Sequence, residues 1–428
     1  MRARAGHAWL PSFIALSSVR AKLQPLSFST RGEFTILQVA DAHVCDAGAP
    51  CLGVPPDDAR SCSSANTTSL VRRAIRAARP SLVVFTGDNI CALATDPYGA
   101  MWRAFAPAID ARVPWTALLG NHDDEGGNAT RVELMARISS WPGFEASERM
   151  STWLAFAGQP LSAGTFAIRV HPRAEGAAGG GDGLILWLLD SGSASTARAG
   201  SPSLSDEQLV WVGAIAGRLA ARAAGAGAAR ITALAFVHKP LPQFEYVSPA
   251  DELFTGERDE EVSPMPGQEH FLEMLAAAGG VRAVFSGHDH LCDFCGVADG
   301  VRLCYGGSAG FTAYGRADVP RRVRVIRALA DGQTISTFKL AASADDGLDV
   351  RDCEVLLSSH DASARSACSA PRPTAPTPRP DARRYERYEP ELERPSEPIW
   401  GHAVKRRRRG LLRAAAEARV WQPGARSA

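Results

Sequence analysis

Five short segments of this 428-residue chain carry side chains whose types and spacing suit metal-ion binding. Two neighbouring cations need nitrogen and oxygen donors, one bridging carboxylate and open positions for substrate and water. The candidates, in chain order, are Asp41, His43, Asp88, Asn121, His122, Asp123, His238, His288 and His290. Each segment alone has a structural alternative, such as a turn residue at Asn121 or a core histidine at His238. All five in order, each after a strand-like run, favour a shared metal centre.

The segments follow apolar runs of the kind that form buried strands. We expect these strands at Glu33–Ala40, Leu82–Phe85, Pro114–Leu119, Ile231–Val237 and Val281–Phe285. Helical patterns lie between them, at 68–79 (capped by Asn66 or Thr67), 99–112, 205–223 and 268–278. Alternating strands and helices predict an α/β fold with a largely parallel sheet, whose strand ends meet along one edge.

Other runs predict antiparallel strands. Residues 164–190 read as a hairpin around a glycine-rich tip. Three later runs, at 301–305, 322–329 and 334–340, alternate polar and apolar residues. Such alternation is typical of antiparallel strands with one solvent-exposed face.

The ordered segments resemble the signature of the calcineurin-like metallophosphoesterase superfamily. The surrounding text, including ILQVADAH, FTGDNI, LLGNHD, FVHKPLPQF, FSGHDHLCDFCG and LCYGGSAGFTAYGRA, resembles the compact purple-acid-phosphatase-related proteins of plants, algae and fungi, some of which are labelled inactive. The resemblance covers Gly32–Leu340. It implies a sandwich of two mixed β-sheets flanked by helices, with the site at the strand ends.

The resemblance also implies two metal sites that share one carboxylate. The first would consist of Asp41, His43, Asp88 and His290, and the second of Asp88, Asn121, His238 and His288. His122 would lie beside the phosphate as a catalytic residue, and Asp123 would orient either His122 or the turn at Asn121. These donors suit iron, zinc or manganese about equally, so two divalent or trivalent ions are expected.

The sequence departs from true purple acid phosphatases at two positions. Those enzymes place a metal-binding tyrosine three residues after the Gly-Asp aspartate and a glycine two residues after the first aspartate. Cys91 and His43 stand there in this chain. We therefore expect no purple iron–tyrosinate band, with His43 supplying the missing ligand. Cys91 could be a thiolate ligand or an ordinary buried cysteine, and we expect the second.

Two cations would make hydroxide available from a bound water near neutral pH and would neutralise phosphoryl charge. The resemblance thus implies a hydrolase of small phosphoric esters, with phosphomonoesters as first choice. The alternatives are a phosphodiesterase on small or nucleotide substrates and a catalytically silent protein that binds metal or phosphate. A net charge of +1 and the lack of interleaved aromatic and basic runs argue against long nucleic acids. The sequence makes no prediction of oligomeric state.

The amino terminus predicts a targeting segment. Five basic residues and a short apolar core, Leu10–Ser17, precede the first acidic residue, Glu33. A secretory signal and a transit peptide both fit this pattern, and an untargeted start is the alternative. Glycosylation sequons at Asn66 and Asn128 agree with secretion. We expect a secreted or endomembrane and vacuolar protein, with plastid or cytoplasm as alternatives. No apolar run is long enough to span a bilayer.

Nine cysteines raise the question of disulfides. Cys51 and Cys62, like Cys295 and Cys304, bracket about ten residues and could close loops, and the odd count leaves at least one free thiol. Cys292 and Cys295 have the spacing of a metal clip, but pairing of Cys295 with Cys304 is our expectation.

We expect three parts: a leader at 1–32, a catalytic domain at 33–343 and a largely disordered tail at 344–428. The tail contains the Pro-rich stretch Pro371–Pro398, which cannot bury a core. It also contains the basic run Lys405–Arg409, for which nuclear import or contact with an anionic surface is the alternative to a solvated tail.

Overall fold

The computed structural model describes residues 25–358 with gaps, the longest at 150–162, 173–182, 193–203 and 226–231. The leader before residue 25, the glycine-rich tip and the basic run of the tail lie outside the described residues. Among the helices that are described, none is long and apolar enough to cross a membrane.

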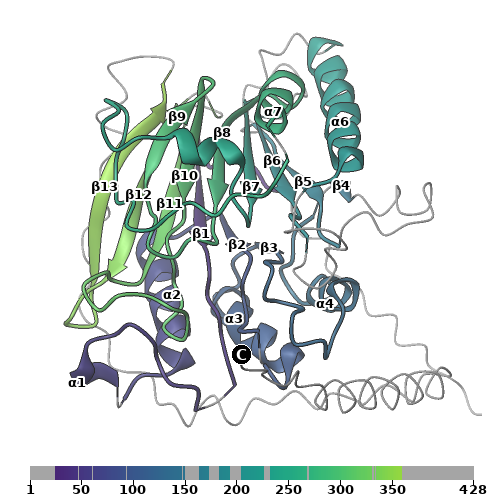
Figure 1. Cartoon of the computed structure of the whole chain (residues 1–428). Helices are drawn as coiled ribbons and strands as arrows, with labels where there is room; N and C mark the ends of the chain where they lie inside the picture. The colour runs from purple at the N-terminus through teal and green to yellow at the C-terminus, as the bar shows by residue number, and fades with distance from the viewer. Residues whose placement is uncertain are drawn as a thin grey trace, which may run out of the picture. The chain divides into compact units, whose positions relative to one another are not determined.

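Two mixed β-sheets make up the domain (Figure 1). The first runs in the order β13-β12-β11-β1-β2-β3, and the second in the order β4-β5-β6-β7-β8-β10-β9. The strands of the first sheet are β1 (Glu33–Val39), β2 (Leu82–Thr86), β3 (Trp115–Leu118), β11 (Arg322–Leu329), β12 (Thr334–Ala342) and β13 (Leu348–Leu357). Those of the second are β4 (Glu148–Arg149), β5 (Phe166–Val170), β6 (Leu184–Leu189), β7 (Thr232–Val237), β8 (Val281–Ser286), β9 (Cys295–Ala298) and β10 (Val301–Tyr305).

Parallel strands form the β1–β2–β3 end of the first sheet and the centre of the second, as the alternation of strands and helices predicts. β2 pairs in parallel with β1 and β3, and β7 pairs in parallel with β6 and β8. β2, β3, β6 and β7 are buried along their whole length, as expected for strands covered on both faces. The predicted hairpin is also present, as the antiparallel pair β5 and β6. All five candidate segments follow the carboxyl ends of strands β1, β2, β3, β7 and β8.

Helices lie around the two sheets (Figure 1). They are α1 (Pro56–Ala59), α2 (Ser64–Ala78), α3 (Pro97–Asp110), α4 (Arg131–Ile138), α6 (Asp206–Gly225), α7 (Phe271–Gly279) and the 3-10 helix η1 (Pro242–Tyr246). Of these, α2 and α3 are packed on the first sheet and α6 and α7 on the second. In α3, Phe105 stacks on Trp115 of β3 with ring centroids 4.7 Å apart, and in α6, Trp211 meets Trp187 of β6 edge-on. Side chains from the inner faces of both sheets share one apolar core, which includes Phe236 stacked on Phe285.

Helix α2 begins earlier than the sequence predicts. Its N-cap is Ser63, whose hydroxyl accepts from the Ala65 backbone, and not Asn66 or Thr67. The Asn66 side chain instead accepts from the Ser63 backbone, which completes a capping box. The sequon asparagine therefore lies inside the first turn of the helix.

The later strands do not have the solvent-exposed face that their alternation predicts. β10 and most of β11 and β12 are buried, and β10 is parallel to β8 although antiparallel to β9. The buried cations Arg322 and Lys339 pair with the carboxylate of Asp293. Buried charges persist only when paired in this way, so the alternation reflects an internal ionic network and not a wet face.

The first sheet also continues past residue 343, where the sequence predicts the domain to end. β13 pairs with β12 from Leu348 to Leu357 and forms an edge of the sheet. Two carboxylates of the run LDVRDCEVLL pair with buried cations of the domain, Asp352 with Lys339 of β12 and Glu354 with Arg302 of β10. The ordered domain therefore extends at least through residue 357.

Candidate metal centre

The turns after β1, β2, β3, β7 and β8 bring the seven predicted metal ligands together at the carboxyl ends of the strands. Two groups of donors form there, each with its ligand atoms within 4.8 Å of one another. The first group is Asp41, His43 and His290, and the second is Asp88, His238 and His288.

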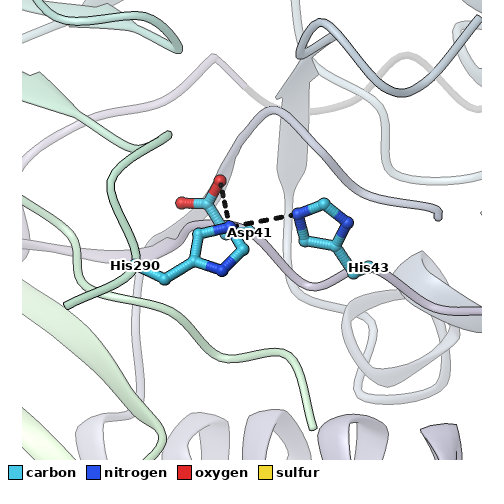
Figure 2. A group of neighbouring side chains, drawn as sticks. All are labelled: Asp41, His43 and His290. Atoms are coloured by element: carbon cyan, nitrogen blue, oxygen red, sulfur yellow. Dashed lines mark hydrogen bonds and ion pairs between the residues drawn. The ribbon is translucent and has the colours of Figure 1, made fainter. Parts of the chain in front are cut away.

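The first group joins the β1 turn to the β8 turn (Figure 2). The Nε2 atoms of His43 and His290 lie 3.2 Å apart, and His290 Nε2 lies 3.6 Å from the Asp41 carboxylate. Burial lowers the pKa of His43 to about 4, so this ring is neutral at neutral pH. Two imidazole nitrogens at this distance suit a hydrogen bond between the rings or a cation held by both.

The second group centres on His238, at the end of β7. His238 Nδ1 donates to the Thr86 carbonyl at 3.0 Å, which turns Nε2 toward Asp88 at 3.3 Å and toward the Asn121 amide oxygen at 3.0 Å. Burial lowers the pKa of His238, but the Asp88 and Asp41 carboxylates raise it to about 9. The proton on His238 Nε2 therefore occupies the position between this nitrogen and the Asp88 and Asn121 oxygens where a metal ion could bind.

Asp88 lies between the two groups. Its Oδ2 is 3.3 Å from His238 Nε2 and 3.5 Å from His43 Nε2, while its Oδ1 accepts from the His122 backbone. Burial raises the pKa of Asp88, but His238 and His43 hold it well below its usual range. Gly120 makes this approach feasible, since a Cβ there would come within 2.0 Å of Asp88 Oδ1. An ionised carboxylate with an oxygen facing both groups has the position of a bridging ligand.

Four of the predicted ligands have left-handed backbone conformations. The φ angles are 52° at Asp41, 40° at His43, 47° at Asp88 and 81° at His288. Such conformations cost about 1–3 kcal/mol each for side-chain-bearing residues and cluster at functional sites. Hydrogen bonds between the turns hold them, including His43 N to the Asp88 carbonyl at 2.8 Å and His288 N to the Asp41 carboxylate at 3.0 Å.

The Asp123 side chain forms its hydrogen bonds with the Asn121 turn and with Asn89 and Ile90, although the sequence left open whether it would orient His122 or that turn. Its carboxylate accepts from the backbone of Gly120 at 2.7 Å, from Ile90 at 2.9 Å and from the Asn89 amide at 2.9 Å. Burial and the nearby Asp88 raise the pKa of Asp123 to about 6. Asp123 is therefore a structural support of the centre in this structure.

His122 has a different partner, which the sequence analysis missed. Its Nδ1 contacts the Glu125 carboxylate, and its Nε2 lies 4.0 Å from Asp88 Oδ2. The ring is partly exposed. Burial lowers its pKa, but Asp88 and Glu125 raise it above its ordinary value. Glu125 lies three residues after His122 in an expected turn, so the spacing itself could have suggested the pair.

A pocket of about 310 Å³ opens over both donor groups. Its lining residues are Asp88, His122, Glu260, Glu261, Ser263, His288, Asp289, His290 and Tyr314. The pocket thus exposes one carboxylate shared by the groups, together with His122, to a molecule that enters from solvent.

Arg131 is a second residue that the sequence analysis missed. The buried guanidinium donates to the carbonyls of Leu119 and Gly120 and pairs with Asp124 and Asp190. It therefore fixes the end of β3 just before Asn121. Its sequence position, at the start of α4, gives no signal for this contact.

Cys91 is not an ordinary buried thiol, so the expectation for this residue is wrong. It forms a disulfide with Cys45, with Cα atoms 5.2 Å apart, and has no free thiolate to offer a metal. The expected pair Cys295–Cys304 and the pair Cys51–Cys62 are both present. Among the described cysteines, Cys292 is the free thiol, and burial raises its pKa to about 12.

Comparison with known proteins finds a matching family model and several similar proteins. A family model described as calcineurin-like phosphoesterase matches residues 34–292. The Arabidopsis thaliana protein named "Probable inactive purple acid phosphatase 29" is 37% identical over 73% of this chain and 82% of its own length. "Probable inactive purple acid phosphatase 14" of the same plant is 34% identical over 71% and 77%. A dimetal phosphatase structure from Danio rerio is similar at a TM-score of 0.46 with 14% identity, covering 71% of this chain and 95% of that one.

Proposed function

Because the chain belongs to the calcineurin-like phosphoesterase family, we propose that it is a metal-dependent hydrolase of small phosphoric monoesters. One observation carries the proposal: Asp88 of the second donor group also faces His43 of the first, and it lines an open pocket. A protein that only needed a stable fold would have no physical reason to keep buried carboxylates and imidazoles facing one another in strained turns.

The donor set fits two metal ions. Asp41, His43, Asp88 and His290 would hold one ion, and Asp88, Asn121, His238 and His288 would hold the other. Asp88 is ionised and His43 is neutral at neutral pH, as ligation requires, and an ion in the second group would displace the proton from His238 Nε2. Nitrogen and oxygen donors of this kind suit iron, zinc or manganese. Bound there, two cations would lower the pKa of water and neutralise phosphoryl charge.

The chain's own residues then have separate tasks. His122, partly exposed in the pocket, would donate a proton to the leaving oxygen from Nε2, while Glu125 holds Nδ1. Asp123 and Arg131 would keep the Asn121 turn fixed from behind. A phosphodiesterase would use the same groups, and a catalytically silent metal- or phosphate-binding protein would use the ligands without His122.

One assay separates these three functions. The purified protein is tested on p-nitrophenyl phosphate and on bis-p-nitrophenyl phosphate, with Mn²⁺, Zn²⁺ or Fe²⁺ added. Faster hydrolysis of the monoester supports the proposal, and faster hydrolysis of the diester replaces it with the alternative. A protein that binds two ions per chain and hydrolyses neither ester contradicts both. A visible spectrum of the iron-loaded sample should lack the purple band, because no tyrosine occupies the position of Cys91.

We also propose that the protein follows the secretory route. The pairs Cys45–Cys91, Cys51–Cys62 and Cys295–Cys304 support this, because stable disulfides persist in oxidising compartments. Of the two sequons, Asn128 is exposed, whereas the Asn66 side chain accepts the Ser63 backbone N–H inside the first turn of α2, so Asn128 is the better glycan acceptor. A mass shift on deglycosylation that is lost in Asn128→Gln, after expression in a eukaryotic host, would test this proposal.

A further inference from the structure

Tyr314 lies flat against His290, a predicted ligand of the first donor group. The two ring centroids are 3.8 Å apart and the planes differ by 14°, so the rings are stacked. Tyr314 belongs to none of the five segments that predicted the site, and it follows β10 in the chain. One side of its ring therefore covers His290, and the residue also lines the pocket.

Hydrogen bonds tie the same two residues together. His290 Nδ1 donates to the Tyr314 carbonyl at 3.0 Å, which leaves Nε2 to face His43 and Asp41. The His290 backbone N–H donates to the Tyr314 hydroxyl at 3.1 Å. Tyr314 thus holds both the ring and the backbone of His290.

Glu260 in turn holds Tyr314. The tyrosine hydroxyl donates to one oxygen of the Glu260 carboxylate at 2.9 Å, and the Leu291 backbone donates to the other. The carboxylate therefore connects Tyr314 to the turn that carries His290. No part of this arrangement reaches His238, whose ring is oriented by the Thr86 carbonyl at the end of β2.

We propose that Tyr314, held by Glu260, is a positioning residue that fixes the His290 ring so that Nε2 points into the first donor group. The proposal rests on the proposed function only in taking that group as a metal site. Partners that orient a ligating histidine typically contribute 10–100-fold to metal affinity. Since His290 and His238 are oriented by different neighbours, loss of Tyr314 should weaken binding of one metal ion and leave binding of the other unchanged.

The test is a calorimetric titration of the metal-free protein with Mn²⁺ and, separately, with Zn²⁺. Tyr314→Leu removes the ring but keeps the backbone carbonyl. Tyr314→Phe keeps the stacked ring and removes the hydroxyl, and Glu260→Gln weakens its anchor. Tyr246→Leu is the matched control, because Tyr246 is an exposed tyrosine on η1 that does not line the pocket.

We expect Tyr314→Leu to weaken one of the two binding events by about 10–100-fold and to leave the other within about twofold of wild type. Tyr314→Phe and Glu260→Gln should weaken the same event by less, and Tyr246→Leu should change neither. The melting temperature of each metal-free variant shows whether it folds. If Tyr314→Leu does not fold, the other two variants decide the question.

Wild-type affinity for both ions in every folded Tyr314 and Glu260 variant would overturn the proposal. An equal loss of affinity for both ions would also overturn the proposal, because that result indicates that the whole centre has become less ordered. These titration outcomes can be told apart from a failure of the proposed function. A wild type that binds two ions without hydrolysing any ester removes the function but leaves the positioning role, since the titration does not depend on activity.

Discussion

Cys45 and Cys91 form a disulfide that joins the turn carrying Asp41 and His43 to the turn carrying Asp88. The same two turns are already paired through backbone bonds, from His43 N to the Asp88 carbonyl and from Val44 N to the Asn89 carbonyl. The covalent link lies two residues beyond His43 and three beyond Asp88. It therefore ties the first donor group to the carboxylate that both groups share.

Replacing Cys45 and Cys91 together with serine should destabilise the protein. The chain-entropy relation gives about 4 kcal/mol for a loop of 46 residues, against about 2.6 kcal/mol for the nine-residue separation of Cys295 and Cys304. Urea unfolding of the two double variants measures the difference. A smaller loss of free energy of unfolding for the Cys45/Cys91 variant than for the Cys295/Cys304 variant would contradict the prediction.

Only the Cys45/Cys91 variant should also lose affinity for metal, because only that disulfide joins two ligand-bearing turns directly.

Asp88→Ala should abolish binding of both metal ions. The Asp88 carboxylate faces His43 in one donor group and His238 in the other, so its removal takes a ligand from each. Elemental analysis of the purified variant counts the ions per chain. Asp110→Ala, which removes an exposed carboxylate at the end of α3, is the control and should retain both ions. Two ions retained by Asp88→Ala would refute the bridging position.

His122→Ala should leave the metal content unchanged and lower turnover by about 10²–10⁴-fold, the usual range for a group that transfers a proton. The loss should be larger for alkyl phosphates than for p-nitrophenyl phosphate, because a good leaving group needs little protonation. His270→Ala, on the exposed start of α7, is the matched control. Equal turnover in wild type and His122→Ala, with both ions bound, would remove His122 from the mechanism.

Asp293→Asn should destabilise the protein in a pH-dependent way. Burial raises the pKa of Asp293, but Arg322 and Lys339 lower it to about 2, below the unfolded value of 3.8. A depressed carboxylate pKa stabilises the fold above the unfolded pKa, and this contribution disappears as pH falls through the folded pKa. This lowering of the Asp293 pKa contributes about 2 kcal/mol to the free energy of unfolding at neutral pH.

Urea unfolding of wild type and Asp293→Asn at several pH values measures this effect. The difference in free energy of unfolding between wild type and Asp293→Asn should stay constant from pH 7 to pH 5. It should narrow by about 1 kcal/mol at pH 3. Asp110→Asn should have nearly the same free energy of unfolding as wild type at every pH, because Asp110 is exposed. A gap for Asp293→Asn that is unchanged at pH 3 would show that the carboxylate is not held ionised by its cations.

Local sequence was sufficient for the parallel strands and for gathering the candidate ligands. Buried parallel strands are short apolar runs, and the polar residue after each one falls at the carboxyl end of the sheet, where strand ends gather. Asp41, Asp88, Asn121, His238 and His288 could be found in this way because each lies within three residues of its own strand. The family resemblance then supplied the division into two groups, which the distances around Asp88 support.

Only the tertiary structure decided the contacts between segments that are far apart in the chain. Cys45 meets Cys91, Tyr314 stacks on His290, and Asp293 in the loop before β9 pairs with Lys339 of β12. No local pattern predicts such pairs, because they depend on strand register and on how the turns pack. For the same reason, the polar residues of β11 and β12 suggested a solvent-exposed face, because the sequence does not show that they pair inside the fold. The identity of a side chain indicates its chemistry, but its partners follow from the fold.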